Sequence, residues 1–408
     1  MTDRPKTTID APWLRSPAAR KVMGVLAAAG GDPRFVGGSV RDAVLGRAAS
    51  DLDIASRLAP EDAITTLERD GIATVPTGLA HGTVTAVLGS DTFEITTLRR
   101  DLATNGRHAE VAFTDDWRED AARRDFTMNA LSADIDGNVY DYFGGLEDLR
   151  AGRVACVGEA TARFREDFLR ILRFFRFHAG YALGDYDAEA LAAARDLGSN
   201  LLALSGERLR QETLKLLAAP NGPAVWRDMV ANGIARVYLP EAGDVERLAA
   251  VAAIEARLPA LLAPDPIRRL AAATLHDARA GESVAARLRL SGEERDRLVF
   301  LLQPGETSDP HLPGAVRRAV YRHGNQRTTD RLVLLADHAR SDEGLERALE
   351  LAGVYAAPAL PVSGKDVLAL GLEPGPEIGR RLKSLETWWL TLELRPTRED
   401  CLERLRAG

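Results

Sequence analysis

The stretch FVGGSVRDAVLGRAASDLDIAS, residues 35–56, combines a glycine pair, a short amphipathic segment and two aspartates one residue apart. Successive side chains of a strand point to opposite faces, so residues i and i+2 share a face. We expect residues 50–55 to form a strand. Asp51 and Asp53 then point together to one side, and the intervening Leu52 points into a core. Two carboxylates at this spacing suit Mg²⁺ and can bridge a pair of ions about 3.5–4 Å apart. A turn with both aspartates facing water is the alternative for an isolated D-x-D.

The residues before these aspartates have the pattern of a phosphate-binding turn. They predict a strand over 33–36, a tight turn over 37–38 and a helix over 39–45, with Ser39 as the N-cap. A helix N-terminus after a glycine turn presents free backbone N–H groups and a partial positive charge to an anion. Arg41, near that terminus, adds a guanidinium fork. Glycines close many turns, so this pattern has weight only together with the aspartates that follow.

A third carboxylate lies on a predicted strand further along the chain. Residues 92–98, TFEITTL, alternate so that Phe93, Ile95 and Thr97 share one face and Glu94 lies on the other. Glu94 is then either a third carboxylate near the metal ions or a solvent-facing glutamate. The pattern leaves both interpretations open.

The string GGSVRDAVLG followed by DLDI resembles the polymerase β-like nucleotidyltransferase superfamily. Within it, the chain resembles the class II tRNA nucleotidyltransferase and bacterial poly(A) polymerase family. Two later motifs are similar to the same family: RRDFTMNAL at 123–131 and EDFLR at 166–170, which LRFFRF follows. The resemblance extends over about 33–240 and more loosely over the tail. It implies a two-metal nucleotidyl transfer with Mg²⁺ held by Asp51 and Asp53.

The same resemblance implies that the arginines of RRDFTMNAL, Arg124 among them, contact the triphosphate and ribose of a nucleotide. Surface arginines flanking a helix cap are the alternative, with Asp125 as the cap. Residues 99–120 are polar with little periodicity and are expected to form a loop. A loop of this length inside a compact domain is unusual unless it is functional. In the family, that stretch is associated with the switch from adding C to adding A.

The segment TARFREDFLRILRFFRFHAGY, residues 161–181, predicts one amphipathic helix. Asp167 and Arg170 lie at i, i+3 spacing beside its apolar stripe, where a surface ion pair is the alternative interpretation. EDFLR followed by LRFFRF resembles the nucleotide-selecting helix of the family. One departure is Phe168, where many relatives have proline, and its place on the stripe predicts little consequence. The apolar stripe consists of Phe164, Phe168, Ile171, Leu172 and Phe175.

An Asp–Arg pair can distinguish bases. Cytosine and adenine present an exocyclic amino donor next to a ring-nitrogen acceptor, so Asp167 can accept from the amino group and Arg170 can donate to the ring. Uracil and guanine place a carbonyl next to a ring N–H, and mispaired buried polar groups cost about 1–3 kcal/mol each. The pair therefore accepts C and A and rejects U and G without a nucleic-acid template. Arg173 and Arg176 continue the basic rows and are placed for nearby phosphate or base contacts.

Composition agrees with this interpretation without deciding it. With 408 residues and 45% hydrophobic content, the chain can hold about two to four units with cores of their own. A formal charge of −7 argues against a generally basic nucleic-acid binder, but arginines cluster at 118–124 and 163–176. Only two cysteines, Cys156 and Cys401, are present, without a zinc-binding spacing. Together with the lack of an apolar leader or membrane-length apolar run, this favours the reducing cytoplasm and no membrane partner.

The predicted fold class is an α/β N-terminal nucleotidyltransferase head, with a mixed β-sheet and helices, followed by an all-α neck, body and tail. The expected boundaries are 20–145 for the catalytic head and 146–205 for the neck with the nucleotide-selecting helix. The body is expected over 206–270 and an RNA-binding tail over 271–408.

Three further patterns lie in the helical part. Residues 206–241 predict two helices separated by prolines. His276 next to Asp277 lacks further metal ligands at a suitable spacing and is interpreted as structural. Residues 363–389 predict two helices that flank a turn with glycines and prolines, either a phosphate-binding helix–hairpin–helix or an ordinary helical hairpin.

Together the motifs predict template-independent addition of C and A nucleotides (CCA) to the 3′ end of tRNA, with CTP and ATP as substrates and Mg²⁺ as cofactor. Gly38, Arg41 and Arg124 are expected to hold the triphosphate and sugar, and Asp167 and Arg170 to read the base. A poly(A) polymerase, a CC-only or A-only tRNA nucleotidyltransferase and a catalytically inactive RNA-binding protein remain as alternatives. The acceptor stem is expected to bind neck and tail largely by shape.

Overall fold

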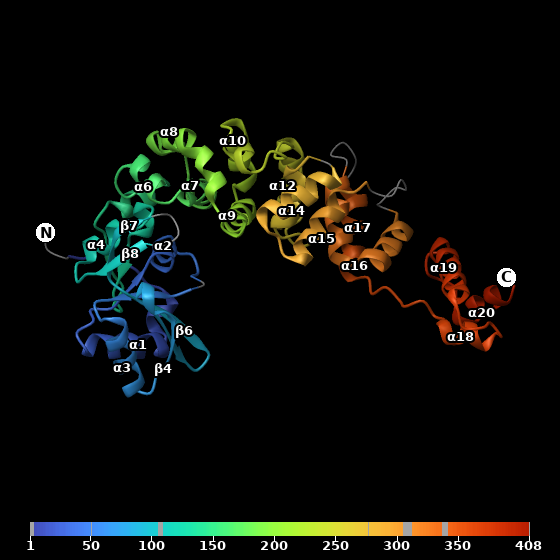
Figure 1. Ribbon diagram of the computed structural model, residues 1–408, viewed down its shortest axis with the longest axis horizontal. Coiled ribbons are helices and arrows are strands. Elements are labelled where there is room, and N and C mark those ends of the chain that lie inside the picture. Colours follow the sequence, from blue (N-terminus) through green and yellow to red (C-terminus); the bar gives the residue numbers. More distant parts are fainter. Residues whose placement is uncertain are drawn as a thin grey trace. The chain divides into compact units, whose positions relative to one another are not determined.

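The structure is a computed structural model that describes residues 4–49, 51–104, 109–275, 277–304, 312–336 and 342–407. The chain divides into two compact units, Met1–Tyr238 (unit 1) and Leu239–Gly408 (unit 2) (Figure 1). Unit 1 contains a mixed sheet followed by helices, and unit 2 is helical. The predicted fold class is therefore confirmed. The finer division into head, neck, body and tail stays a prediction.

An eight-stranded sheet organises the first part of unit 1, with strand order β1-β10-β9-β2-β3-β6-β5-β4. Strands β3 and β6 pair in parallel, and the other pairs described in this sheet are antiparallel. A separate two-stranded sheet pairs β7 with β8. The strands are β1 (Thr7–Thr8), β2 (Arg34–Val36), β3 (Asp53–Ser56), β4 (Ala73–Gly78), β5 (Thr83–Leu88), β6 (Asp91–Thr97), β7 (Arg99–Thr104), β8 (Ala109–Phe113), β9 (Ser132–Ala133) and β10 (Asn138–Tyr140).

Helices of unit 1 are α1 (Pro17–Ala28), α2 (Gly38–Val44), α3 (Pro60–Arg69), α4 (Trp117–Ala122), α5 (Gly145–Ala151), α6 (Ala160–Glu166), α7 (Leu169–Tyr181), α8 (Ala188–Leu197), α9 (Gly206–Ala218), α10 (Gly222–Ala231) and α11 (Ile234–Tyr238). Short 3₁₀ helices are η1 (Pro12–Arg15), η2 (Leu79–His81), η3 (Thr127–Asn129) and η4 (Gly198–Ala203).

Both faces of the large sheet carry buried side chains. Phe35, Ile54 and Ile95 lie opposite one another across β2, β3 and β6 and are buried on one face. The residues next to them in sequence point to the other face. There a helix covers the sheet, because one buried cluster joins α4 to the strands: Val36, Ala55, Leu98 and Trp117.

Strand β3 begins at Asp53, later than the predicted start at residue 50. Its antiparallel neighbour β2 ends at Val36, where the chain turns away at Gly37, so β3 has no partner there before Asp53. Ile54 is fully buried, but Leu52 precedes the strand and is only half-buried. The prediction that Leu52 points into the core was therefore wrong.

The helix after the glycine pair also begins earlier than predicted. Helix α2 starts at Gly38, and its N-cap is Gly37, which has a φ of 71° and no capping side chain. Ser39 does not cap this helix, because its hydroxyl donates to the carbonyl oxygen of Val36 at 3.3 Å. The left-handed backbone at Gly37 is a conformation that glycine adopts without strain.

The predicted single helix over 161–181 is broken in two. Helix α6 ends at Glu166, Asp167 has an extended backbone with φ −153° and ψ 107°, and α7 begins at Leu169. The reason is local, since the Asp167 carboxylate accepts a hydrogen bond from the Leu169 N–H at 3.1 Å and so starts a new helix. The predicted apolar stripe is largely confirmed: Phe164, Ile171, Leu172 and Phe175 are buried, and Phe168 is half-buried.

The region 206–241 contains the two predicted helices, α9 and α10, and a third that was not predicted. This third helix, α11, follows Gly233, whose φ of 77° ends the preceding helix. A glycine in the left-handed region is a common helix terminator.

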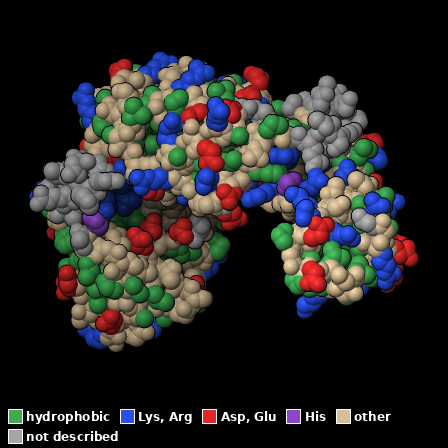
Figure 2. Space-filling model, turned by 45° about the vertical axis from the view of Figure 1, so that its right-hand side comes forward, with side chains coloured by type: hydrophobic (Ala, Val, Ile, Leu, Met, Phe, Trp, Pro, Cys, Tyr) green, Lys and Arg blue, Asp and Glu red, His purple; other side chains and the backbone are tan. Residues whose placement is uncertain are grey.

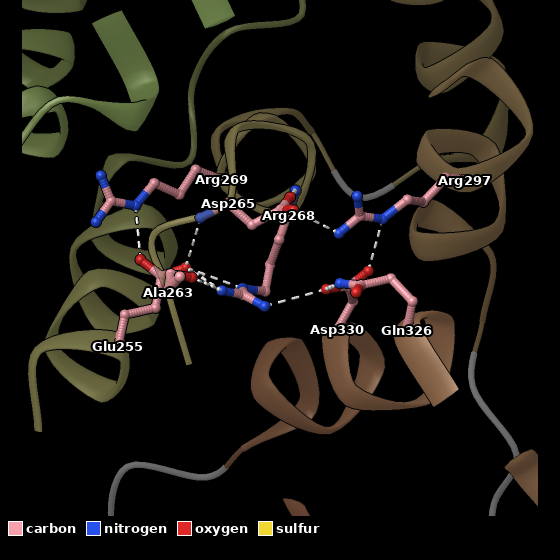
Figure 3. A network of polar contacts seen from close by, with 8 residues as sticks. All are labelled: Glu255, Ala263, Asp265, Arg268, Arg269, Arg297, Gln326 and Asp330. Atoms are coloured by element: carbon pink, nitrogen blue, oxygen red, sulfur yellow. Dashed lines mark hydrogen bonds and ion pairs between the residues drawn. The ribbon is translucent and has the colours of Figure 1, made fainter. Parts of the chain in front are cut away.

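Unit 2 contains a buried ion cluster in which α12, α13, α15 and α16 meet (Figure 3). Arg268 contacts Glu255 at 2.6 Å and Asp330 at 3.1 Å, and all three side chains are almost fully buried. Arg269 also pairs with Glu255, and Arg297 pairs with Asp330. The helices of unit 2 are α12 (Val245–Arg257), α13 (Pro266–Ala273), α14 (Ala278–Leu288), α15 (Gly292–Leu302), α16 (Pro313–Leu335), α17 (Asp342–Val354), α18 (Gly364–Ala369), α19 (Pro376–Thr391) and α20 (Arg398–Arg406).

The predicted hairpin over 363–389 has the expected layout, with α18 and α19 on either side of a turn at Gly371. Its core includes Trp389, which is 1% exposed. His276 lies outside the described residues, and Asp277 is the N-cap of α14. No helix in the described part of the chain is long and apolar enough to cross a membrane.

Candidate active site

A cleft of about 700 Å³ opens beside the start of β3. Asp51, Asp53 and Glu94 line this cleft, and Asp53 lies directly beside Glu94 in the parallel register of β3 and β6. The two aspartates thus face one cleft, although Asp51 precedes the strand instead of lying on it. Glu94 is exposed while its strand neighbours Phe93 and Ile95 are buried, as the alternation predicts.

The electrostatics of the cleft disfavour negative charge on Asp53. Partial loss of solvent around the Asp53 carboxyl raises its pKa, and the negative charges of Glu94 and Asp51 raise this pKa further. The positive charge of Arg124 acts in the opposite direction. A cation bound between these carboxylates would relieve that repulsion. Among the residues that the structure describes, no group of three or more His, Cys, Asp or Glu side chains has metal-binding geometry. The candidate metal ligands are therefore the two aspartates.

The glycine turn lies close to two of the predicted phosphate-binding arginines. A Cβ atom on Gly37 would lie 3.3 Å from the Arg124 guanidinium, and one on Gly38 would lie 3.5 Å from that of Arg41. The φ of 71° at Gly37 favours glycine, and a side chain there would also make Arg124 shift by a few tenths of an ångström. Arg124 in turn donates to the buried carboxylate of Asp120 at 3.1 Å.

Arg41 is less available to a phosphate than predicted. Its side chain is buried and donates to Asn129 Oδ1 at 2.8 Å and to Asp42 at 2.9 and 3.0 Å. Its guanidinium also stacks on the Tyr181 ring at 4.1 Å. The sequence did not indicate Asn129 as a partner of Arg41, because the two residues are 88 positions apart.

The predicted loop over 99–120 is instead a β-hairpin and a helix. Strands β7 and β8 pair in antiparallel register, from Arg99 opposite Phe113 to Thr104 opposite Ala109, and α4 begins at Trp117. The loop prediction was wrong, because β7 and β8 pair with each other although their sequence has little of the alternation by which a strand is recognised. The Asp120 carboxylate accepts from the Arg99 N–H at 3.3 Å and connects the hairpin to α4.

Asp125 does not cap a regular helix, because only the short 3₁₀ helix η3 follows it and its N-cap is Phe126. Instead, its buried carboxylate accepts from the Phe126 N–H, from Asn129 Nδ2 and from Arg173. Burial opposes ionisation of Asp125, but the charge of Arg173 and these hydrogen bonds outweigh it and hold its pKa below the usual value.

Asp167 and Arg170 occupy the break and the first turn of α7, and each is held by a different partner. Asp167 accepts from Arg208 Nη2 of α9 at 2.7 Å. Arg170 donates to Glu166 at 2.6 Å and to the carbonyl oxygen of Arg163 at 3.2 Å. The structure therefore places both residues at one helix start. Arg208 is a site residue that sequence reasoning missed.

Arg173 and Arg176 project from α7 into ion pairs within unit 1. Arg173 donates to Asp125 at 2.7 Å and lies 3.7 Å from Glu212, and Arg176 pairs with Glu212 as well. Both guanidinium groups face the Phe177 ring. A direct phosphate or base contact would require either side chain to exchange one of these carboxylates for a ligand.

Charged side chains of both signs line a hollow in the left-hand part of the space-filling view (Figure 2). Around Asp53 in unit 1, charges of both signs likewise lie close together, because Glu94, Asp51 and Arg124 all act on its carboxyl.

Comparison with known proteins identifies the family. A model of the poly A polymerase head domain matches residues 33–155, and one of the probable RNA and SrmB-binding site of polymerase A matches residues 186–244. The chain is 34% identical over 388 residues to the mitochondrial CCA tRNA nucleotidyltransferase 1 of Danio rerio, which covers 91% of this chain and 86% of the relative. The chain belongs to the class II CCA-adding enzyme and poly(A) polymerase family. The family resemblance of its motifs is thus confirmed.

Other members of the family agree with this assignment. A CCA-adding enzyme of Lactobacillus delbrueckii subsp. bulgaricus is 31% identical over 390 residues, covering 90% of this chain and 92% of the relative. A crystal structure of the Bacillus stearothermophilus CCA-adding enzyme in complex with CTP superposes with a TM-score of 0.78 at 28% identity, covering 98% of both chains. The head-domain match of this family includes Asp51, Asp53 and Arg124, whereas Asp167 and Arg170 lie between the two matched regions.

Proposed function

We propose that this protein adds C and A nucleotides (CCA) to the 3′ end of tRNA from CTP and ATP without a nucleic-acid template. The observation that carries this proposal is the cleft that Asp51 and Asp53 both line. Arg124 lies close enough to act on the Asp53 carboxyl and lies beside the glycine turn. The similarity to CCA-adding enzymes over nearly the whole chain supports the same substrate class.

Asp51 and Asp53 are proposed to hold Mg²⁺. Carboxylate oxygens are the ligands that Mg²⁺ prefers, and the mutual repulsion around Asp53 fits a bound cation. Glu94, in register with Asp53, is the third carboxylate that lines the same cleft. The chemistry that such ions supply is activation of the tRNA 3′-hydroxyl and neutralisation of the charge on the departing pyrophosphate.

Different residues of the chain are proposed to bind different parts of the nucleotide. The turn at Gly38, with Arg124 and Arg41 beside it, is proposed to hold the triphosphate and sugar. Asp167 is proposed to accept from the exocyclic amino group of C or A, and Arg170 to donate to the ring nitrogen. Both would act from the start of α7, directly after the break that ends α6.

Arg173 and Arg176 are proposed to support the nucleotide site through the ion pairs that they form. Their pairing with Asp125, which precedes η3, and with Glu212 of α9 orients α7, which carries Arg170. Nearby phosphate or base contacts remain part of the proposal for these two arginines.

The second candidate function is poly(A) synthesis, which the match to the poly A polymerase head domain favours. The two functions share the cleft and the base-reading pair and differ in when addition stops. CC-only or A-only addition is a further variant of the same chemistry. An inactive RNA-binding protein is disfavoured because every proposed metal and base ligand is present.

The neck, residues 146–205, and the tail, residues 271–408, are proposed to bind the tRNA acceptor end largely by its shape, with α18 and α19 as a phosphate-binding hairpin. We propose a cytoplasmic location, although three relatives are mitochondrial by name. Cell fractionation with an antibody against the protein tests the location.

One assay tests the function. Purified protein is given tRNA that ends before CCA, after C or after CC, with each nucleotide supplied singly and together. CCA addition predicts C on the first two substrates, A on the third and no extension beyond the final A. Long A tracts on any RNA would instead identify a poly(A) polymerase, and no incorporation at all would reject both.

A further inference from the structure

Residues 123–125 are held by three arginines from the base-reading helices. The first two residues of this segment accept through their carbonyl oxygens, from Arg170 at 3.2 Å and from Arg163 at 2.6 Å. The third accepts through its carboxylate, from Arg173 at 2.7 Å. The segment that carries Arg124 is therefore attached at every residue to α6 or α7.

A second set of contacts continues from this segment to the glycine turn. Asn129 Nδ2 donates to Asp125 Oδ1 at 2.9 Å, and Asn129 Oδ1 accepts from Arg41 Nη1 at 2.8 Å. Arg41 belongs to α2, the helix that begins at Gly38. The side chains Arg41, Asn129, Asp125 and Arg173 thus form a continuous polar chain from α2 to α7, which we call the buried link.

Three of the four members of the buried link lie away from solvent, Arg173 at its α7 end is 32% exposed, and the charges of the link are matched. Arg41, Asn129 and Asp125 are 7%, 7% and 8% exposed. Arg41 is neutralised by Asp42, and Arg173 by Asp125 and Glu212. A buried polar network whose members are all partnered is rigid, because any displacement exposes an unpaired group at a cost of about 1–3 kcal/mol.

The aromatic ring of Phe177 contacts both end members of the buried link. The guanidinium groups of Arg41 and Arg173 each lie 5.3 Å from the ring centroid, one from either end of the buried link. Phe177 itself packs edge-on against Phe126 at 5.4 Å. Tyr181 adds a second connection from α7 to α2, since its hydroxyl donates to Asp42 at 2.9 Å.

We propose that the buried link sets the position of the base-reading residues relative to the glycine turn, with Asn129 and Asp125 as positioning residues. This inference rests on the proposed function, in which the turn holds the triphosphate and α7 reads the base. The triphosphate and the base belong to one molecule, so a nucleotide binds tightly only if the distance between the two subsites matches the distance between these two groups. Neither positioning residue needs to touch the nucleotide.

Binding of whole nucleotides and of a fragment tests the link. Dissociation constants for CTP, ATP and inorganic triphosphate are measured by calorimetry in Mg²⁺ for the wild type and for Asn129→Ala and Asn129→Asp. The alanine variant removes both hydrogen bonds, and the aspartate variant keeps the shape but sets a carboxylate against Asp125. Both should weaken CTP and ATP roughly 10- to 100-fold. Binding of inorganic triphosphate, which occupies only the turn, should stay within about 2-fold of the wild type.

Thr127→Val is the matched control. Thr127 lies in the same 3₁₀ helix and donates to buried Asp148 at 2.6 Å, but it is not part of the link. This variant should lower the melting temperature and leave all three dissociation constants unchanged.

Three results would overturn the inference. Equal losses for inorganic triphosphate and CTP would mean that Asn129 supports the phosphate site or the fold in general. A loss that disappears with 2′-deoxy-CTP would mean that Asn129 touches the sugar directly. Unchanged CTP binding in both variants would mean that the link does not set the separation. These are binding measurements without RNA, so a wild-type protein that binds CTP but adds nothing to tRNA would reject the proposed function alone.

Discussion

Arg208 Nη2 of α9 donates to Asp167 Oδ2 of the α6–α7 break at 2.7 Å. The carboxylate proposed to read the base is therefore held by an arginine that lies 41 positions further along the chain, in another helix. Their side chains are 28% and 25% exposed, so the pair remains accessible to water and to a ligand. An ion pair of this exposure contributes little to stability, which leaves orientation of Asp167 as its main effect.

Removal of Arg208 should therefore affect nucleotide use more than stability. Arg208→Ala frees the Asp167 carboxylate to rotate, and we expect kcat/KM for CTP and ATP to fall roughly 3- to 10-fold. The melting temperature should change little. Arg227→Ala, an exposed arginine on α10, is the control and should alter neither quantity. A large loss of stability without a kinetic effect would contradict this role of Arg208.

Replacement of Asp167 or Arg170 by alanine tests base reading directly. Each change should lower kcat/KM for CTP and ATP by roughly 10- to 200-fold, because about 1–3 kcal/mol of base recognition is lost. Discrimination against UTP and GTP should shrink as well. All four nucleotides are measured on tRNA that ends before CCA, with Arg165→Ala on the exposed side of α6 as the control. Wild-type ratios of CTP to UTP and of ATP to GTP in both variants would show that this helix start does not read the base.

The carboxylates of the cleft should be indispensable for chemistry. Asp51→Ala or Asp53→Ala should abolish incorporation of both C and A, because loss of a metal ligand removes several kcal/mol of transition-state stabilisation. Binding of tRNA and the melting temperature should stay nearly unchanged. Asp62→Ala, on the exposed face of α3, should behave as the wild type. Near-normal turnover of either cleft variant in Mg²⁺ would reject the two-metal assignment.

The β7–β8 hairpin should matter more for A than for C. Replacing residues 101–110 by a short Gly-Ser linker removes most of the paired region but leaves Arg99 and Phe113 in place. We expect C addition to be spared more than A addition, measured separately on tRNA ending before CCA and after CC. Equal loss of both activities would mean that the hairpin supports the fold or the triphosphate site.

The buried ion cluster of unit 2 should be essential for stability. Arg268→Met leaves Glu255 and Asp330 each short of a partner, and removing one member of a buried ion pair costs about 3–5 kcal/mol. Arg347→Ala breaks an exposed pair with Glu343 and should cost under about 0.5 kcal/mol. Thermal unfolding of both variants measures the difference. Similar melting temperatures would show that hydrophobic packing alone holds these helices.

Local patterns predicted the elements well where one face of an element is buried. The alternation around Glu94 was confirmed, because a strand that covers a core must place apolar residues at every second position. The same reasoning failed for β7 and β8, which pair with each other although their sequence shows little alternation.

Breaks within helices were missed for a related reason. The apolar stripe of 161–181 continues across Asp167, so periodicity alone indicates one helix. The break comes from a side-chain hydrogen bond between Asp167 and the Leu169 N–H, and such a bond depends on which rotamer the tertiary structure favours.

The sequence by itself determined the family, the fold class and the identities of the proposed metal and base ligands, because the order and spacing of its motifs require no knowledge of distant contacts. Only the tertiary structure decided how those residues are held. Arg208 beside Asp167, Asn129 between Arg41 and Asp125, and Glu255 beneath Arg268 all pair across loops or helices. The many arginines and carboxylates of this chain allow a large number of alternative pairs. For the pairs of Arg41, Asn129, Asp125, Glu255 and Arg268, burial selects among these alternatives, because in a low-dielectric interior only the arrangement that satisfies every charge avoids a desolvation cost.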